Sequence, residues 1–399
     1  MTESARIPSR IPSFTHATPA VRIHSGADCL AQLPGELDRL KAKRAVVFCG
    51  ASIGASLELK QVIAALGERH AGTFAGVKAH SPLPAVLQGM RALREFEADA
   101  VIAIGGGSAV VTARASSILL AEGENIHELC TQYPAGRTPV SPKLNRPKLP
   151  QIVLPTTPST AYGKAGSAVR DPEAGRRLTL FDPKTRAGVL LFHPGLAMTA
   201  PAPLFVDAGF QALATAASGM ESRRHESLAD ALLMHALRLF VEHLPRVATP
   251  DSAASRLELL MAGFMAGQGT DYSPVGMAAS ITHAIGATFG VPNGACNALV
   301  LPATLRYNLP VTGARIRLLA EALGAGRFDQ DEAALTAASA ALVDLLKVTG
   351  APVRLRDIGI TREALADLAA HSMEDWFLHL NPRKVASAEE LVSVLEAAW

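Results

Sequence analysis

The stretch AIGGGSAVV, residues 103–111, holds three consecutive glycines directly after a short apolar run. An apolar run that ends in glycine is typical of a buried strand entering a turn, and the residues beyond it have helical spacing. Glycines let backbone N–H groups approach a ligand without a Cβ in the way, and the helix start offers its positive end to phosphate. We predict that Gly105, Gly106, Gly107 and Ser108 bind a dinucleotide pyrophosphate, although a tight turn without a ligand explains the glycines equally well.

The segments around this stretch repeat the same alternation of strand and helix. Further apolar, strand-like runs are RAVVFCGAS (44–52), QIVLP (151–155) and RAGVLLF (186–192), and helical patterns occupy 57–70 and 85–100. Strands that alternate with helices predict a parallel, doubly wound sheet. The run 186–192 could instead form a hairpin with RRLTLFD, 176–182.

The character of the chain changes after about Pro201, where helical patterns alone remain. A chain of 399 residues also favours about two domains. We therefore predict a flexible tail over 1–20, an α/β nucleotide-binding domain over 21–200 and an all-α substrate domain over 201–399. Ligand sites are common in the cleft between two such domains.

A second polar turn, LPTTPSTAY at 154–162, follows the end of a predicted strand. Open α/β sheets bind ligands at this edge, so Thr156, Thr157 and Ser159 could donate to ribose or phosphate oxygens of the cofactor. The same hydroxyls could equally cap the next helix.

Composition excludes several classes of partner. The formal net charge is only +2, from 38 basic and 36 acidic residues, so no global field attracts nucleic acid or an anionic membrane. The four scattered cysteines lack metal-binding spacing and fit a reducing compartment. No apolar run is long enough for a membrane helix, and the N-terminus lacks a signal-peptide pattern. We predict a cytoplasmic protein that acts on a small molecule.

Five ordered motifs resemble the iron-containing alcohol dehydrogenase family: GGGS, LPTTPST, AGFQALATAASGMES, THAIGATFGVPNGACNALVLPATLRYN and the late NPR. The run AGTFAGVKAHSPLP is similar to the maleylacetate reductase branch, and the resemblance extends from about Ile23 to the C-terminus. It implies the two-domain architecture shared with dehydroquinate synthases, hydride transfer between NAD or NADP and a carbonyl, and a homodimer.

The resemblance also identifies where a metal would sit. Metal-bearing members hold their cation with one Asp and three His, and the matching positions here are Gln211, Thr215, Ala279 and Asn293. Divalent cations need carboxylate or imidazole donors, whereas these residues offer neutral amides, a weak hydroxyl and a methyl group. We therefore expect no metal, and we predict that the four residues line a substrate pocket.

Other groups must then stabilise the charge that develops on the substrate oxygen. His283, which the resemblance places on the helix facing the cleft, could donate a proton. Lys164, with Tyr162, could hold a carboxylate or the oxyanion, or could be an ordinary solvated lysine. The segment behind them is basic, and we expect at most one or two of its cations to face a ligand: Arg170, Arg176, Arg177, Lys184 and Arg186.

Gly50 completes the predicted cofactor site. It follows the strand AVVFC, where many NAD-preferring members of the family place an Asp that repels a 2′-phosphate. NADPH is therefore not excluded electrostatically.

Two functions from different classes remain open at this point. The first is a metal-independent, NAD(P)H-dependent reductase of a small polar or oxo-acid carbonyl compound, motivated by the glycine turn and His283. The second is a family member without redox activity, either a nucleotide- or metabolite-binding protein or a lyase or hydrolase, motivated by the simultaneous loss of four ligand positions.

Overall fold

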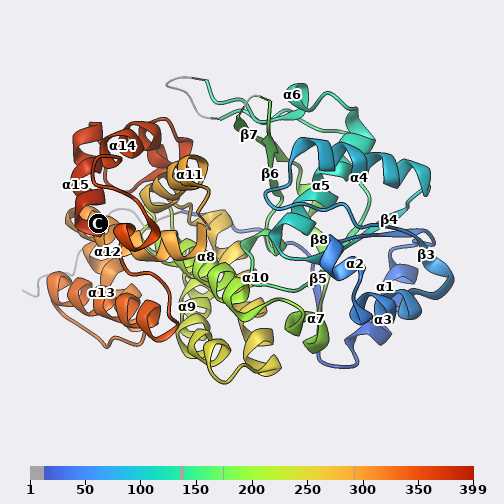
Figure 1. The fold of residues 1–399 in the computed structure, drawn as a ribbon, viewed down its shortest axis with the longest axis horizontal. Coiled ribbons are helices and arrows are strands. Elements are labelled where there is room, and N and C mark those ends of the chain that lie inside the picture. Colours follow the sequence, from blue (N-terminus) through green and yellow to red (C-terminus); the bar gives the residue numbers. More distant parts are fainter. Residues whose placement is uncertain (1–12, 135–138, 174, 292) are drawn as a thin grey trace, which may run out of the picture.

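The computed structural model describes residues 13–134, 139–173, 175–291 and 293–399. Its first half alternates strands and helices, and its second half is helical (Figure 1). The strands are β1 (Arg22–Ser25), β2 (Ala45–Phe48), β3 (His70–Phe74), β4 (Ala100–Gly105), β5 (Gln151–Pro155), β6 (Gly166–Asp171), β7 (Arg176–Phe181) and β8 (Ala187–Phe192). The helices of the first half are α1 (Leu33–Arg39), α2 (Ala51–Gly54), α3 (Leu57–Leu66), α4 (Leu83–Glu95), α5 (Gly107–Glu122), α6 (Ile126–Leu129) and α7 (Pro194–Met198).

The helices of the second half are α8 (Ala202–Met220), α9 (Ser227–Ala248), α10 (Ala253–Tyr272), α11 (Met277–Phe289), α12 (Asn293–Ala322), α13 (Asp331–Val348), α14 (Leu365–Met373) and α15 (Ala388–Ala398). Short 3-10 helices are η1 (Cys29–Gln32), η2 (Gly67–Arg69), η3 (Thr160–Tyr162), η4 (Pro183–Thr185), η5 (Leu355–Ile358) and η6 (Trp376–Leu380). The change from sheet to helices falls between β8 and α8.

The main sheet is parallel throughout, in the order β1-β8-β5-β4-β2-β3, which confirms the predicted fold class. Its central strands β2, β4, β5 and β8 are buried on both faces because helices cover both. Ala100 and Ile102 of β4 pack into the core under α1 and α3, whereas Val101 and Ala103 pack into the core shared with α4 and α5. Figure 1 shows α4 and α5 on one side of the strands and α1 and α3 on the other.

The hairpin predicted between 176–182 and 186–192 is wrong. β8 pairs in parallel with β1 and β5, whereas β7 pairs antiparallel with β6 in a separate two-stranded sheet. The burial of side chains explains the difference. β8 is almost continuously buried, as a central parallel strand must be, whereas β7 buries Leu178 and Leu180 on one face only.

The two halves are joined by one continuous core and by a buried arginine. Arg256 of α10 donates from Nη1 to the carbonyl oxygens of Ala197 and Ala200, each over 2.6 Å, and pairs with Asp251. These carbonyls follow β8, so the guanidinium fixes the start of the helical half to the end of the sheet. A buried guanidinium is costly unless its N–H groups are hydrogen-bonded and its charge is paired, as they are here.

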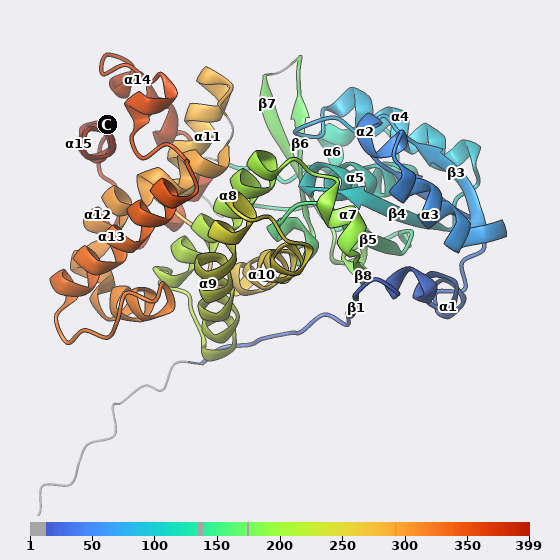
Figure 2. The same cartoon turned by 60° about the horizontal axis from the view of Figure 1, so that its bottom comes forward.

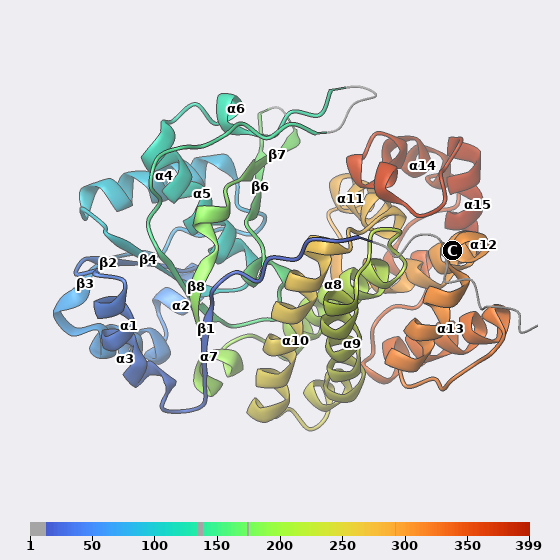
Figure 3. The same ribbon diagram turned by 180° about the vertical axis from the view of Figure 1, so that it is seen from behind.

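The described part of the N-terminal segment lies along the helical half before it enters the sheet at β1 (Figure 3). The imidazole of His16 stacks on Tyr272 with centroids 3.9 Å apart and bonds Glu226 over 2.7 Å. Ala17 exchanges two backbone hydrogen bonds with the Tyr272 hydroxyl. The contacts hold His16 and Ala17 against α9 and α10.

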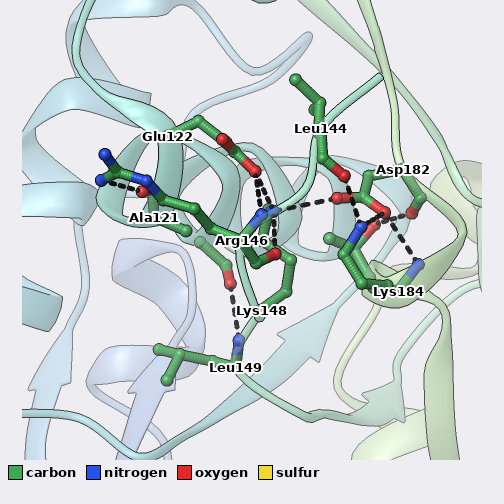
Figure 4. Close-up of polar contacts among 10 residues, drawn as sticks. Ala121, Glu122, Leu144, Arg146, Lys148, Leu149, Asp182 and Lys184 are labelled. Atoms are coloured by element: carbon green, nitrogen blue, oxygen red, sulfur yellow. Dashed lines mark hydrogen bonds and ion pairs between the residues drawn. The ribbon is translucent and has the colours of Figure 1, made fainter. Parts of the chain in front are cut away.

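A buried lysine secures the segment that leads into β5. Lys148 Nζ lies 2.6 Å from Glu122 Oε1 and 3.0 Å from Asp182 Oδ2, and its side chain is 0% exposed (Figure 4). Lys184 contacts the same Asp182 and donates to the carbonyl of Leu144. Because Lys184 is used in this way, it is not among the cations that could face a ligand. Among the described residues no helix is both long and apolar enough to cross a membrane.

Candidate functional site

The loops after three neighbouring strands meet at one edge of the main sheet. β2, β4 and β5 are adjacent and parallel, so their carboxyl ends bring together Gly50, the glycine turn and the turn that begins at Thr156. In the strand order, β3 follows β2 toward one edge of the sheet, whereas β5 and β8 follow β4 toward the other edge. The switch point therefore lies between β2 and β4, where open α/β sheets bind nucleotides.

The glycine turn has the strand–turn–helix geometry that the sequence predicts. Gly105 has a φ of +146°, which favours glycine, and Gly106 is the N-cap of α5, which begins at Gly107. A Cβ on Gly106 would lie 2.6 Å from Thr157 Oγ1, and one on Gly107 would lie 2.8 Å from Ser159 Oγ. The two predicted cofactor turns thus touch at positions that only glycine permits, and the cradle fits a dinucleotide pyrophosphate on the N-terminus of α5.

The second turn is largely occupied with its own structure. The Thr156 N–H donates to the Gly105 carbonyl over 3.1 Å, and Ser159 Oγ accepts from Ala161 N at the start of η3. The capping alternative therefore describes Ser159 in this structure. The threonines at 156 and 157 are 6% and 7% exposed.

Tyr162, predicted to act in catalysis, lies in the core. It is 1% exposed, and its hydroxyl donates to the carbonyl of Thr157 and, over 3.4 Å, to that of Gly105. Burial raises the pKa of this phenol far above its ordinary value. The hydroxyl holds the two cofactor turns together, and we do not retain Tyr162 among the proposed catalytic groups.

Lys164 has other charged neighbours than His283: Asp271 and Arg186 act on the lysine, whereas Asp375 pairs with the imidazole. Lys164 is half-buried, and within the described residues its ammonium has no hydrogen bond or ion pair. Burial lowers the pKa of Lys164, Asp271 opposes that shift and Arg186 adds to it. Arg186 and Asp271 themselves pair over 2.5 Å beside a pocket between the halves. That pocket is lined by His16, Thr18, Pro19, Gly163, Arg186, Leu228, Leu232, Gln268, Asp271 and Tyr272.

Hydrogen bonds through Asn297 connect the helices that carry the positions matched to a metal site. Gln211 Oε1 accepts from Asn297 Nδ2 over 2.5 Å, and Asn297 Oδ1 accepts from Thr282 Oγ1 over 2.7 Å. Thr215 donates its hydroxyl to the Gln211 carbonyl of its own helix. Gln211, Thr215 and Ala279 are all half-exposed, while the Asn293 side chain lies outside the described residues.

This donor set does not fit a divalent cation. The Gln211 oxygen and the Thr215 hydroxyl already have partners, both groups are neutral, and Ala279 has no donor. Throughout the described ranges, no three His, Cys, Asp or Glu side chains lie together in a way that could hold a metal ion. Iron and zinc prefer anionic oxygen, thiolate or imidazole donors.

His283 has an acidic partner that the sequence did not reveal. Its Nδ1 lies 2.7 Å from Asp375 Oδ2, and its ring meets Phe377 edge-on at 5.6 Å. Burial alone would raise the pKa of Asp375, but the hydrogen bond and charge of His283, the Phe377 N–H and the charge of Arg177 lower it overall. The carboxylate is therefore ionised and orients the imidazole. The sequence around Asp375, SMEDWF, carries no motif that marks this role.

A parallel sheet with a glycine cradle at its switch point, joined to a helical half that presents an oriented imidazole, is the arrangement expected of a nucleotide-dependent oxidoreductase. The family models identify the particular family. Residues 19–194 match iron-containing alcohol dehydrogenase, and residues 205–399 match the C-terminal domain of the Fe-containing alcohol dehydrogenase family. The chain belongs to this family and is an oxidoreductase of the alcohol dehydrogenase or carbonyl reductase type.

Similar proteins cover nearly the whole chain. Maleylacetate reductase 1 of Cupriavidus pinatubonensis is 28% identical over 93% of this chain and 94% of its own, and the NAD-dependent methanol dehydrogenase of Bacillus methanolicus is 28% identical over 94% and 97%. The solved alcohol dehydrogenase from Oenococcus oeni superposes with a TM-score of 0.87 at 22% identity, covering 97% of this chain and 100% of that one. The recognised family and fold class are confirmed.

Proposed function

We propose that this protein is a metal-independent, NAD(P)H-dependent reductase of a small polar or oxo-acid carbonyl compound, similar to a maleylacetate reductase. The observation that carries the proposal is the pair formed by His283 and Asp375. The pair presents an oriented imidazole on the same helix as Ala279, one turn away from this position where metal-bearing relatives have a ligand. Relatives named as a maleylacetate reductase and an NAD-dependent dehydrogenase support the reaction class.

The cofactor would be held at the switch point. The N–H groups at the start of α5 and the glycine cradle suit the pyrophosphate, and Gly50 adds no negative charge after β2. When bound, the nicotinamide supplies a hydride to the carbonyl carbon. The absence of an acidic side chain at residue 50 supports use of either NADH or NADPH.

The imidazole supplies the proton. Asp375 accepts from Nδ1–H, which leaves Nε2 as the nitrogen available to a substrate oxygen. As the carbonyl carbon is reduced, the electron pair of the C=O bond moves to oxygen, and His283 transfers its Nε2 proton to that oxygen to give the alcohol. The ionised Asp375 stabilises the imidazolium before this transfer.

No step in this scheme uses a metal, because the neutral groups at Gln211, Thr215 and Ala279 do not fit one. Together with Asn293 they are proposed to line the substrate pocket. We also propose a homodimer on the resemblance to the family, and its mass in solution tests this directly.

Calorimetric titration of NADH and NADPH into chelator-treated protein tests the proposal, with residual metal measured by mass spectrometry. Micromolar binding without metal, followed by oxidation of the cofactor in the presence of aldehydes or oxo acids, is the expected result. Cofactor binding without consumption by any carbonyl compound would instead favour the family member without redox activity. Activity that returns only on adding iron or zinc would contradict metal independence.

A further inference from the structure

The β6–β7 hairpin carries two arginines directly opposite each other. In the antiparallel register Arg170 faces Arg177, and both are exposed on the side of the hairpin that does not enter the core. Like charges at directly opposed positions destabilise a strand pair. The next pair on the other side, Asp171 and Arg176, has opposite charges, so the like-charged pair is a local exception.

Hydrogen bonds join this hairpin to the glycine turn. Arg170 N donates to the Ser81 carbonyl over 3.2 Å, Ser81 Oγ donates to the Ser108 carbonyl over 3.1 Å, and His80 N donates to Ser108 Oγ over 3.1 Å. His80 and Ser81 have φ values of +61° and +47°, which are costly for residues other than glycine. The strained backbone at His80 and Ser81 thus lies between Arg170 and the first turn of α5 and holds the two close together.

The hairpin that carries the two arginines lies across the boundary between the halves from α11, the helix that carries His283. All three ribbon views place β6 and β7 beside α11 (Figure 1, Figure 2, Figure 3). Although the Arg177 side chain reaches solvent, partial burial lowers its pKa, which the charge of Arg170 lowers further and that of Asp375 partly restores. The charge of Arg177 in turn helps to lower the pKa of Asp375. His80 is in the same group: burial lowers its pKa first, followed by the charges of Arg177 and Arg170.

Neither guanidinium has a carboxylate within ion-pair distance in the part of the chain that the structure describes. Asp375, whose charge acts on Arg177, is already hydrogen-bonded to His283 and to the Phe377 N–H. Two guanidinium groups held together therefore lack the anion that would offset their repulsion. Arginine binds carboxylates through two parallel N–H···O bonds, and a carboxylate between the pair would supply that anion.

We propose that Arg170 and Arg177 form a subsite for a substrate carboxylate, with the carbonyl end of the same molecule directed to His283. The inference rests on the proposed reductase function and names its substrate class as short oxo acids. An uncharged aldehyde would leave the two guanidinium groups unpaired and would bind more weakly.

Binding of succinate tests the subsite without requiring turnover. Calorimetry compares the full-length protein with Arg170→Gln and Arg177→Gln, and Arg176→Gln is the matched control on the same hairpin but the opposite face. We expect saturable succinate binding that weakens about tenfold or more in the first two variants and changes less than about twofold in the control. Arg177→Lys, which keeps the charge but loses the planar fork, should lie between. Absence of succinate binding to the unaltered protein, or equal binding by all variants, overturns the subsite.

Turnover separates this inference from the proposed function. The matched substrates are 4-oxobutanoate and butanal, which differ by a carboxylate in place of a methyl group. We expect a kcat/KM at least about tenfold higher for 4-oxobutanoate, with the advantage lost through KM in Arg177→Gln. Reduction of butanal as efficiently as 4-oxobutanoate overturns the subsite while the reductase function stands. If neither aldehyde consumes NAD(P)H, the reductase function fails and the succinate titration still decides the subsite.

Discussion

Asn297 donates its side-chain amide to the Gln211 carbonyl oxygen over 2.5 Å, which links α12 to α8 at the position where metal-bearing relatives have an aspartate ligand. Asn297 is 5% exposed and also accepts from Thr282 of α11. Three helices that a cation would otherwise connect are thus connected by a chain of neutral hydrogen bonds.

Replacing Asn297 should loosen this part of the helical half. Asn297→Ala removes the donor to the Gln211 side-chain oxygen, whereas the Thr282 hydroxyl keeps its bond to the Ala278 carbonyl, and an unmade hydrogen bond of this kind costs about 1–3 kcal/mol. We expect a lower midpoint of thermal unfolding, measured by circular dichroism. Asn145→Ala, at an exposed position, is the control and should leave the midpoint unchanged. Equal midpoints for both variants would remove the stabilising role of the bridge.

Restoring the ligand types should restore metal binding. The combined change Gln211→Asp, Thr215→His, Ala279→His and Asn293→His supplies one carboxylate and three imidazoles, which is a donor set that zinc and iron accept. After dialysis against Zn²⁺ or Fe²⁺, mass spectrometry should find about one ion per chain in this variant and only traces in the unaltered protein. Stoichiometric metal in the unaltered protein would show that its present donors suffice.

Turnover should depend on His283 more than on neighbouring imidazoles. His283→Gln removes the proposed proton donor, and loss of a positioned general acid costs roughly 10²–10⁴ in rate. We expect kcat to fall by that factor while NADH affinity stays nearly constant. His379→Gln, which alters an exposed imidazole beside Trp376, is the control. Lys164→Ala belongs in the same assay, because unchanged turnover there removes the predicted oxyanion role of this lysine.

Closing the glycine cradle should abolish cofactor binding. Gly106→Ala would place a methyl group 2.6 Å from Thr157 Oγ1, so the two turns must separate or the residue must shift. We expect loss of NADH and NADPH binding in calorimetry with little change in helix content. The control Gly35→Ala adds a methyl group with no atom within 4 Å. Retained nucleotide affinity in the Gly106 variant would move the pyrophosphate away from this turn.

Stability should fall as pH rises through the titration of Glu221. Burial raises the pKa of this carboxyl from 4.5 to about 7, and the hydrogen bond from Asn308 only partly opposes the shift. Between these two values the unfolded chain has released the proton and the folded protein has kept it, so unfolding becomes easier with rising pH. The full effect is on the order of 3 kcal/mol and is complete above about pH 7.

Glu221→Gln removes this titration and retains an oxygen for Asn308. Thermal midpoints measured from pH 4.5 to 8 should therefore decline in the unaltered protein and decline less in the variant. Glu374→Gln, at an exposed position, should follow the unaltered curve. Parallel curves for the unaltered protein and Glu221→Gln would mean that this carboxyl does not titrate in the window.

The sequence by itself determined the elements whose signals are local. Continuous apolar runs with glycine ends predict β2, β4 and β5, and the cradle at Gly105 to Gly107 follows from the glycines alone. The sequence also shows that the four positions matched to metal ligands lack suitable donors, because the residue type alone decides whether a side chain can bind a metal. The edge strands β1 and β3 carry no continuous apolar run because they are only partly buried, and Pro302 and Pro310 interrupt the helical pattern of α12.

Tertiary structure alone decided which side chains meet. Asp375 is 92 residues from His283 in the chain, and no local pattern connects them before α11 and η6 pack together. The pairing of β7 with β6 rather than β8 likewise depended on which strand could be buried on both faces, and that pairing is what sets Arg170 opposite Arg177. Residue type specified the available chemistry, whereas long-range packing selected the imidazole, the carboxylate and the guanidinium groups that lie at one boundary.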